Sequence, residues 1–162
     1  MKKLLLLLLI AFVFTSCLRL ENNSWEENQY KPVVLQRSVF EKSIVLENPQ
    51  TINKSGKIYI KGDLMFINDV NKGFHVYDYS DPKNPVRLQF IKVPGATDLA
   101  IIDDIIYINQ AVDLVTITYN SLTKKMDIKN RNKNVFPQKK SPNGFSGNPR
   151  ENEIIIDWNE IK

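Results

Sequence analysis

The chain of 162 residues has one cysteine and one histidine, so it offers few side chains for nucleophilic catalysis or for a transition-metal site. A cysteine–histidine catalytic pair would have to combine Cys17 with His75, which are far apart in the sequence. Zinc sites built from several cysteines and histidines are excluded. His75 alternates with Phe74 and Val76 in a β-type segment. We interpret it as a structural histidine, partly packed or exposed, and we predict no catalytic residue.

Four aspartates, Asp98, Asp103, Asp104 and Asp113, could supply the hard oxygen ligands that Ca²⁺ prefers. Their spacing lacks the dense alternation of an EF-hand loop. They fall at expected strand ends and turns, where aspartate is favoured for its local hydrogen bonds. The sequence also lacks the glycine-rich motifs that bind phosphate. We therefore predict neither a metal site nor a cofactor.

Charge gives no sign of a nucleic-acid partner. The chain has 22 Lys and Arg against 18 Asp and Glu, and a net charge of +4 is too small and dispersed for such a surface. The basic residues near the carboxyl end, Arg131, Lys133, Lys139 and Lys140, have no aromatic stacking platform around them. We interpret them as residues of a solvated loop.

Residues 1–16 have the three parts of a secretory signal peptide. Lys2 and Lys3 come first, residues 4–14 form an unbroken apolar run, and the small residues Thr15 and Ser16 follow. The run is too short for a membrane-spanning helix, which needs about 18 residues or more. A buried core helix would show a polar face, and this run has none. The pattern therefore predicts export.

Residues 14–17, Phe-Thr-Ser-Cys, resemble the lipobox of bacterial lipoproteins. The resemblance implies that Cys17 receives a diacylglyceryl group, that the peptide is cut before Cys17, and that the new amino terminus is acylated, for example with palmitate. Phe14 replaces the family's usual Leu but is apolar. Leu18 follows the cysteine instead of the Asp that marks inner-membrane retention. We therefore expect a lipid anchor in the bacterial cell envelope, on the outer membrane if the organism has two membranes.

Residues 17–55 are expected to form a tether and a lead-in segment. Residues 18–29 are rich in Asn and Glu and read as a flexible spacer. Residues 31–46 predict a short strand or turn, in which Ser38 and Glu41 have the spacing of a capping box for one helical turn.

Residues 56–130 have the alternating pattern of an all-β domain. Turn signals such as Gly62-Asp63 separate eight expected strands, at 57–60, 64–68, 74–79, 86–93, 99–102, 105–109, 114–119 and 125–130. The last four strands repeat the first four after about 40 residues, which is the length and strand count of a propeller blade. We predict two four-stranded antiparallel meanders, an incomplete propeller.

Residues 73–86 resemble the LVIVD repeat of bacterial β-propeller proteins. The resemblance rests on an apolar strand that ends in Asp, on the turn after it and on a closing Pro-Gly turn, here Asp78, Ser80, Asp81, Pro82, Pro85, Pro94 and Gly95. The second unit has Asn-Ser-Leu at 120–122 where the family has Ser-Asp-Pro. The resemblance covers residues 56–130 and implies a β-propeller in an envelope setting, with no shared catalytic residues.

The length conflicts with a closed propeller, which needs about 4 to 8 blades. Residues 131–162 predict a loop-rich tail with one strand at 153–158. Three explanations remain open: the chain is a shortened or truncated relative of a longer protein, blades of different chains assemble through their sheet edges, or the last strand and the lead-in segment cover the open face. We expect residues 154–158 to pair with a blade edge or to mediate association.

Two classes of function fit these patterns. The first is a non-enzymatic envelope lipoprotein whose sheets bind or scaffold a protein or a glycan. The second is an enzyme or a solute-binding lipoprotein whose site forms only on assembly. The sequence contains no acid–base or nucleophile constellation, which favours the first class.

Overall fold

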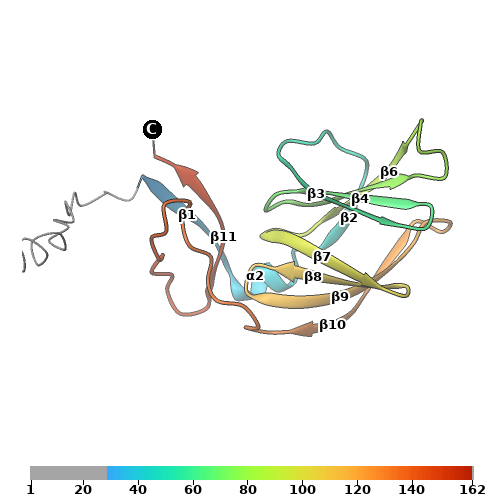
Figure 1. Cartoon of the computed structure of the whole chain (residues 1–162). Coiled ribbons are helices and arrows are strands. Elements are labelled where there is room, and N and C mark those ends of the chain that lie inside the picture. Colours follow the sequence, from blue (N-terminus) through green and yellow to red (C-terminus); the bar gives the residue numbers. More distant parts are fainter. Residues whose placement is uncertain (1–28, 162) are drawn as a thin grey trace, which may run out of the picture.

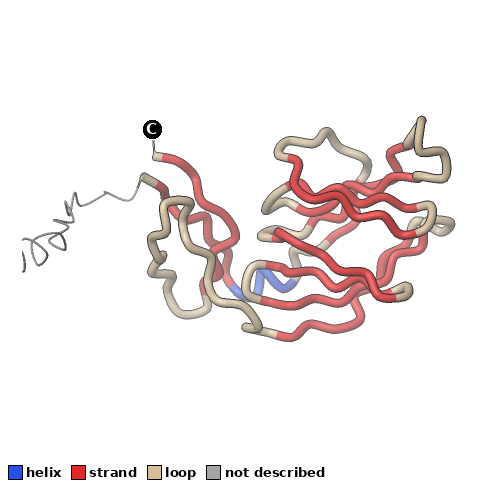
Figure 2. The backbone as a smooth tube through the Cα atoms, viewed as in Figure 1, coloured by secondary structure: helices blue, strands red, loops and turns tan. Residues whose placement is uncertain are grey.

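The structure is a computed structural model that describes residues 29–161, almost all of them in antiparallel strands and their connections (Figures 1 and 2). The predicted signal peptide, spacer and Cys17 lie outside the described residues. The elements in chain order are β1 (Tyr30–Gln36), α2 (Arg37–Glu41), β2 (Val45–Glu47), β3 (Ser55–Lys61), β4 (Leu64–Asp69), β5 (Gly73–Asp78), β6 (Val86–Lys92), β7 (Ala96–Ile102), β8 (Ile105–Gln110), β9 (Asp113–Asn120), β10 (Lys125–Asn132) and β11 (Glu153–Glu160).

Two meanders form the body of the molecule, which confirms the all-β prediction. Strands β3 to β6 pair in sequence, and the short strand β2 adds to β6, so that the first sheet has the order β2-β6-β5-β4-β3. Strands β7 to β10 form the second sheet, of order β10-β9-β8-β7. Neither sheet is closed on itself.

The two meanders repeat each other in register as well as in sequence. Tyr59 pairs with Phe66 in the first sheet, and Ala100 pairs with Tyr107 at the equivalent place in the second. Both first hairpins also have an irregularity at the same point, after Ser55 and after Ala96. The 41-residue spacing of the equivalent residues (59 and 100) is therefore a structural repeat.

The main core lies between the two sheets. The first sheet contributes residues such as Phe66, Phe74 and Val76, and the second contributes residues such as Ile108 and Ile117; each of these is at most 2% exposed. Because side chains alternate along a strand, one face of each sheet points into this core.

Gly73 begins β5 with φ +148°, and a Cβ added there would lie 2.1 Å from the backbone oxygen of Ile91. The close approach of β5 to β6 therefore requires a residue without a side chain at this position.

A separate two-stranded ribbon joins the ends of the described chain. β11 pairs with β1, and Ile154 packs with Phe40 of α2 and with Ala111 and Val112 from the β8–β9 turn. In Figure 1 this terminal ribbon lies on the opposite side from the β3–β4, β7–β8 and β9–β10 turns. The expectation that residues 154–158 pair with a blade edge of the same chain is therefore wrong, and their alternative role in association with another chain stays a prediction. The lead-in strand β1 offers β11 a partner that the short apolar pattern of residues 31–46 did not reveal.

The predicted helical turn exists, but its cap was misplaced. α2 starts after Gln36, whose side chain makes no capping hydrogen bond, so Ser38 lies inside the helix and not at its cap. Tertiary packing stabilises this single turn, because Phe40 is fully buried.

Candidate binding site

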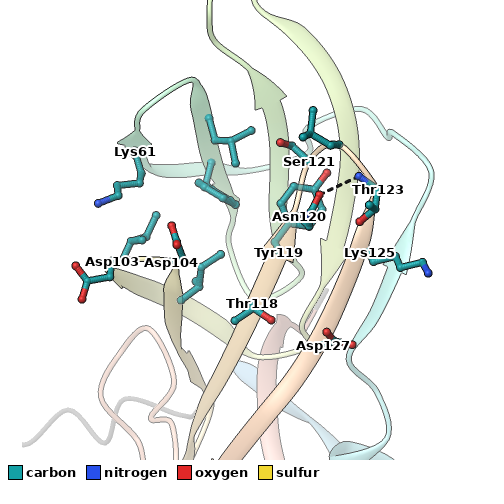
Figure 3. Close-up of a pocket in the computed structure, with 15 residues that line it drawn as sticks. Lys61, Asp103, Asp104, Thr118, Tyr119, Asn120, Ser121, Thr123, Lys125 and Asp127 are labelled. Carbon is teal, nitrogen blue, oxygen red and sulfur yellow. Dashed lines mark hydrogen bonds between the residues drawn. The ribbon is translucent and has the colours of Figure 1, made fainter.

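A hollow of about 600 Å³ opens between the two sheets at the end formed by the β3–β4, β7–β8 and β9–β10 turns (Figure 3). Its apolar lining comes from both sheets: Leu64, Phe66, Ile101, Ile106 and Tyr119. The Tyr119 hydroxyl donates a 2.9 Å hydrogen bond to Gln89 of β6, and burial raises the pKa of this phenol. The bond joins β9 to the first sheet beside the hollow.

Polar groups gather at the mouth of the hollow. Figure 3 places Lys61, Asp103 and Asp104 on one side, and Asn120, Ser121 and Thr123 on the other. Within the described residues, the side chains of Lys61, Asp103 and Asp104 have no hydrogen-bond or ion-pair partner. These free charges next to an apolar lining suit a ligand with an apolar body and polar substituents.

Local backbone geometry positions both sides. Asp103 adopts φ +52° in the two-residue β7–β8 turn, a conformation that Asp tolerates better than most residues. In the β9–β10 turn, the Asn120 side chain accepts a 2.9 Å hydrogen bond from the Thr123 backbone N–H. Leu122, at the tip of this turn, is 94% exposed.

The four aspartates that we considered for Ca²⁺ lie in three different places. Asp103 and Asp104 are in the β7–β8 turn beside the hollow, Asp98 contacts β3, and Asp113 is fully buried at the other end of the second sheet. Within residues 29–161, no three His, Cys, Asp or Glu side chains are close enough to hold a metal ion.

Asp98 connects the first strands of the two meanders. It accepts hydrogen bonds from Lys57 Nζ at 2.6 Å and from the Tyr59 hydroxyl. Burial and the bond to this carboxylate raise the pKa of Tyr59 to about 12. Partial burial of Asp98 works against its ionisation, but the bonds from Lys57 and Tyr59 outweigh it and lower the pKa of this carboxyl.

Asp113 forms a buried ionic cluster that the sequence did not reveal. Arg37 Nη1 lies 2.8 and 2.7 Å from its two oxygens, Arg131 Nη1 lies 2.8 Å from Oδ2, and the Asn134 N–H donates at 3.0 Å. Both guanidinium groups also lie over the Phe40 ring. The cluster connects α2 to β9 and β10, so the interpretation of Arg131 as a solvated loop residue is wrong.

Lys139 is a second basic residue that was expected in solvent but is partly buried. Its amine donates to the Asn71 side chain and to the Gly95 and Ile156 carbonyl oxygens, the latter two at 3.4 Å. Burial lowers its pKa to about 8, although the nearby Asp157 carboxylate raises it in part. The sequence gives no sign of this environment, because the hydrogen-bond partners of Lys139 come from three segments that are distant along the chain.

His75 faces away from the main core, as its alternation with Phe74 predicted, but it is only 2% exposed. Its Nε2 lies 3.3 Å from Asp69, and its ring packs against Phe90 with centroids 4.6 Å apart. Asp69 also accepts the backbone N–H groups of Asn53 and Lys54. His75 is therefore more buried than expected, and it is not among the residues that line the hollow.

Comparisons with known proteins do not identify a relative: no family model, no curated protein and no solved structure matches the chain. Among the described helices, none has the length and apolar character needed to cross a membrane.

Proposed function

We propose that this chain is a lipid-anchored protein of the bacterial cell envelope, on the outer membrane where there are two, and that its LVIVD-like repeats form a non-enzymatic binding or scaffold module. The anchor is Cys17, the only cysteine of the chain, which follows a lipobox-like sequence. The protein partner or glycan binds in the hollow between the two sheets.

One observation carries the binding role. The hollow lies at the end of the molecule opposite to the ribbon where β1 begins the described chain (Figure 1). A module attached through the residues before β1 would therefore present its hollow away from the attachment point. The only histidine is buried against Phe90 and remote from the hollow lining, which fits binding better than acid–base catalysis.

The volume of the hollow favours a second candidate, a solute-binding lipoprotein. About 600 Å³ lies within the range of roughly 300–1,000 Å³ that is usual for small-molecule sites. A thermal-shift screen with envelope glycans, peptides and small solutes separates these ligands. Ser121→Trp should fill the mouth of the hollow and abolish the stabilisation by any ligand that binds there. Val135→Trp, at an exposed position that does not line the hollow, should not.

The anchor is tested by labelling cells with radioactive palmitate. The wild-type chain should incorporate the label and sediment with membranes, and Cys17→Ser should incorporate none and become soluble or persist as an uncut precursor. A wild-type chain that reaches the membrane without label would refute lipidation of Cys17.

A further inference from the structure

Each repeat unit has two distinct faces, which the shared register allows us to compare between the sheets. We define the front face of the first sheet as the face that carries Tyr59, Phe66 and Val76. The equivalent residues in the second sheet are Ala100, Tyr107 and Thr116, since their strand pairings match one for one. The back face carries the residues between them, including Ile58 and Ile67 in the first sheet and Leu99 and Ile108 in the second.

The interface inside the chain is a front face packed on a back face. Phe66 and Val76 belong to the same buried cluster as Leu99 and Ile108. The two sheets therefore do not pack through equivalent surfaces: the front of one unit covers the back of the next. Such packing is heterologous, and it leaves one back face and one front face unused.

Both unused faces expose apolar side chains along the first strands of their meanders. On the front of the second sheet, Ile102 is 60% exposed and Ile105 is 37% exposed, next to the exposed Ala100. On the back of the first sheet, Ile58 is 60% exposed and Ile60 is 56% exposed. Exposed apolar side chains in neighbouring positions of a sheet indicate an interaction surface.

Part of the back face of the first sheet is already covered within the chain, and this limits the size of its exposed apolar surface. Asn53 and Lys54 hold the β2–β3 connection against Asp69, and Tyr77 and Phe90 on the same face are 7% and 3% exposed. Only the β3 side remains open. Inside the chain β7 meets β3 and β4, and the core extends over β8 and β9 through Ile108 and Ile117. The open β3 side is the equivalent of β7, so it corresponds to the first-strand part of the internal contact.

A repeat of the internal contact between two copies would also pair side chains of opposite charge. Inside the chain, Lys57 of the first sheet contacts Asp98 of the second at 2.6 Å. Asp98 is also the equivalent of Lys57 in the repeat, 41 positions on. When the front of the second sheet meets another first sheet, Asp98 therefore meets a second Lys57. Both side chains have room for this, since they are 66% and 45% exposed.

We propose that the open front face of the second sheet binds the open back face of the first sheet of another copy of this chain. The contact continues the internal interface, head to tail, and it brings Asp98 of one copy next to Lys57 of the next. Repetition of the contact closes a ring of blades or extends a row, depending on the rotation between copies. The proposal is independent of what the hollow binds and of the lipid anchor.

Cysteine cross-linking in cells tests the direction of the contact. Inside the chain, the Tyr59 hydroxyl lies 3.4 Å from the Leu99 backbone nitrogen. The equivalent residues across two copies are Ala100 and Ile58. Two differently tagged whole chains, Ala100→Cys and Ile58→Cys, are produced together and treated with a short bis-maleimide. We expect a mixed cross-linked dimer from the pair and its loss when either variant is produced alone.

Three further chains make the result decisive. The wild-type chain measures any reaction of Cys17, and Leu122→Cys, at an exposed turn outside both faces, should react with a thiol dye without forming the dimer. Ile102→Asp added to the Ala100→Cys chain should abolish the mixed dimer. Equal cross-linking of each single variant with itself would overturn the head-to-tail contact, as would the absence of a mixed dimer when both thiols react with the dye.

Discussion

Replacing Asp113 by Asn tests whether the buried ionic cluster holds the lead-in segment to the second sheet. Asp113 is fully buried, and the side chains of its partners Arg37 and Arg131 are only 17% and 12% exposed. The substitution keeps the shape of the side chain but removes its charge. Two guanidinium groups then remain over the Phe40 ring without the Asp113 carboxylate, and the Glu41 carboxylate, 3.8 Å from Arg37, is the acidic group that stays near them.

The magnitude follows from the cost of an uncompensated buried charge. Removal of one partner from a buried ion pair destabilises a protein by about 3–5 kcal/mol. A typical domain has a total stability of about 5–15 kcal/mol, so Asp113→Asn should remove a large part of it. For a module of this size we expect the melting temperature to fall by roughly 10–20 °C.

Urea unfolding of the chain from residue 17 onward, with Cys17→Ser so that no lipid is attached, measures the effect. The control is Asp127→Asn, because the Asp127 side chain is 71% exposed and lies 3.5 Å from Lys129; its loss should cost less than about 1 kcal/mol. If Asp113→Asn is as mild as this control, the reasoning about the cluster is wrong.

The pH dependence gives a second reading of the same cluster. Burial of Asp113 opposes ionisation, but the hydrogen bonds from Arg37, Asn134 and Arg131 outweigh it and lower the pKa of the carboxyl. The carboxylate therefore stabilises the fold above the unfolded pKa of about 3.9, and this contribution is lost as pH falls through the lower folded pKa. Asp113→Asn should show a shallower loss of stability in acid.

Three further predictions concern the backbone, a buried amine and the last strand. Gly73→Ala should prevent stable folding, because the new Cβ would lie 2.1 Å from the backbone oxygen of Ile91. The control is Gly62→Ala, where φ is +55° and the space around the residue is open. This variant should lower the free energy of unfolding in urea by only about 1–2 kcal/mol. Burial lowers the pKa of Lys139 from 10.5 to about 8, so between these pH values the unfolded chain binds more protons than the folded chain. The free energy of unfolding should therefore rise from pH 8 to 10.5. Lys139→Met should remove this rise, and the same rise in the variant would contradict the prediction. Deletion of residues 152–162 should increase dye binding and aggregation, because Phe40 and Ala111 lose the cover of Ile154; a truncated chain that is equally soluble and protease-resistant would show that β11 has no such role.

The sequence predicted the meanders because each strand and each turn is defined by residues that are close together in the sequence. Alternating apolar residues and turns such as Gly62-Asp63 define β3 to β10, and the repeat places equivalent strands 40–41 residues apart. The ribbon was not predicted, because β1 and β11 are more than a hundred residues apart and neither segment marks the other as its partner. Pairing at such a separation depends on the whole fold and not on a local pattern.

The candidate site was also only partly visible in the sequence. Asp103 and Asp104 were recognised as turn residues, but their position opposite Ser121 and Thr123 depends on how the two sheets pack. Arg131 and Lys139 were misread for the same reason. A basic residue in a polar loop reads as solvated unless its buried partners, here Asp113 and the carbonyl oxygens around Lys139, are known.

Equivalent residues on the front faces of the two sheets differ in polarity, because one face is covered inside the chain and the other is open. Val76 is buried against the second sheet, and its equivalent Thr116 has nearly the same shape but a hydroxyl group. Thr118 of β9 and Asn130 of β10 continue this polar character on the outer half of the open face, where Leu114 is the apolar exception on β9. The inner half, with Ile102 and Ile105, retains apolar side chains in contact with solvent. If solvent alone had shaped this face, the inner half would be polar as well. A face divided in this way matches a partner that covers only the first strands, and that is the extent of the open back face beside β3.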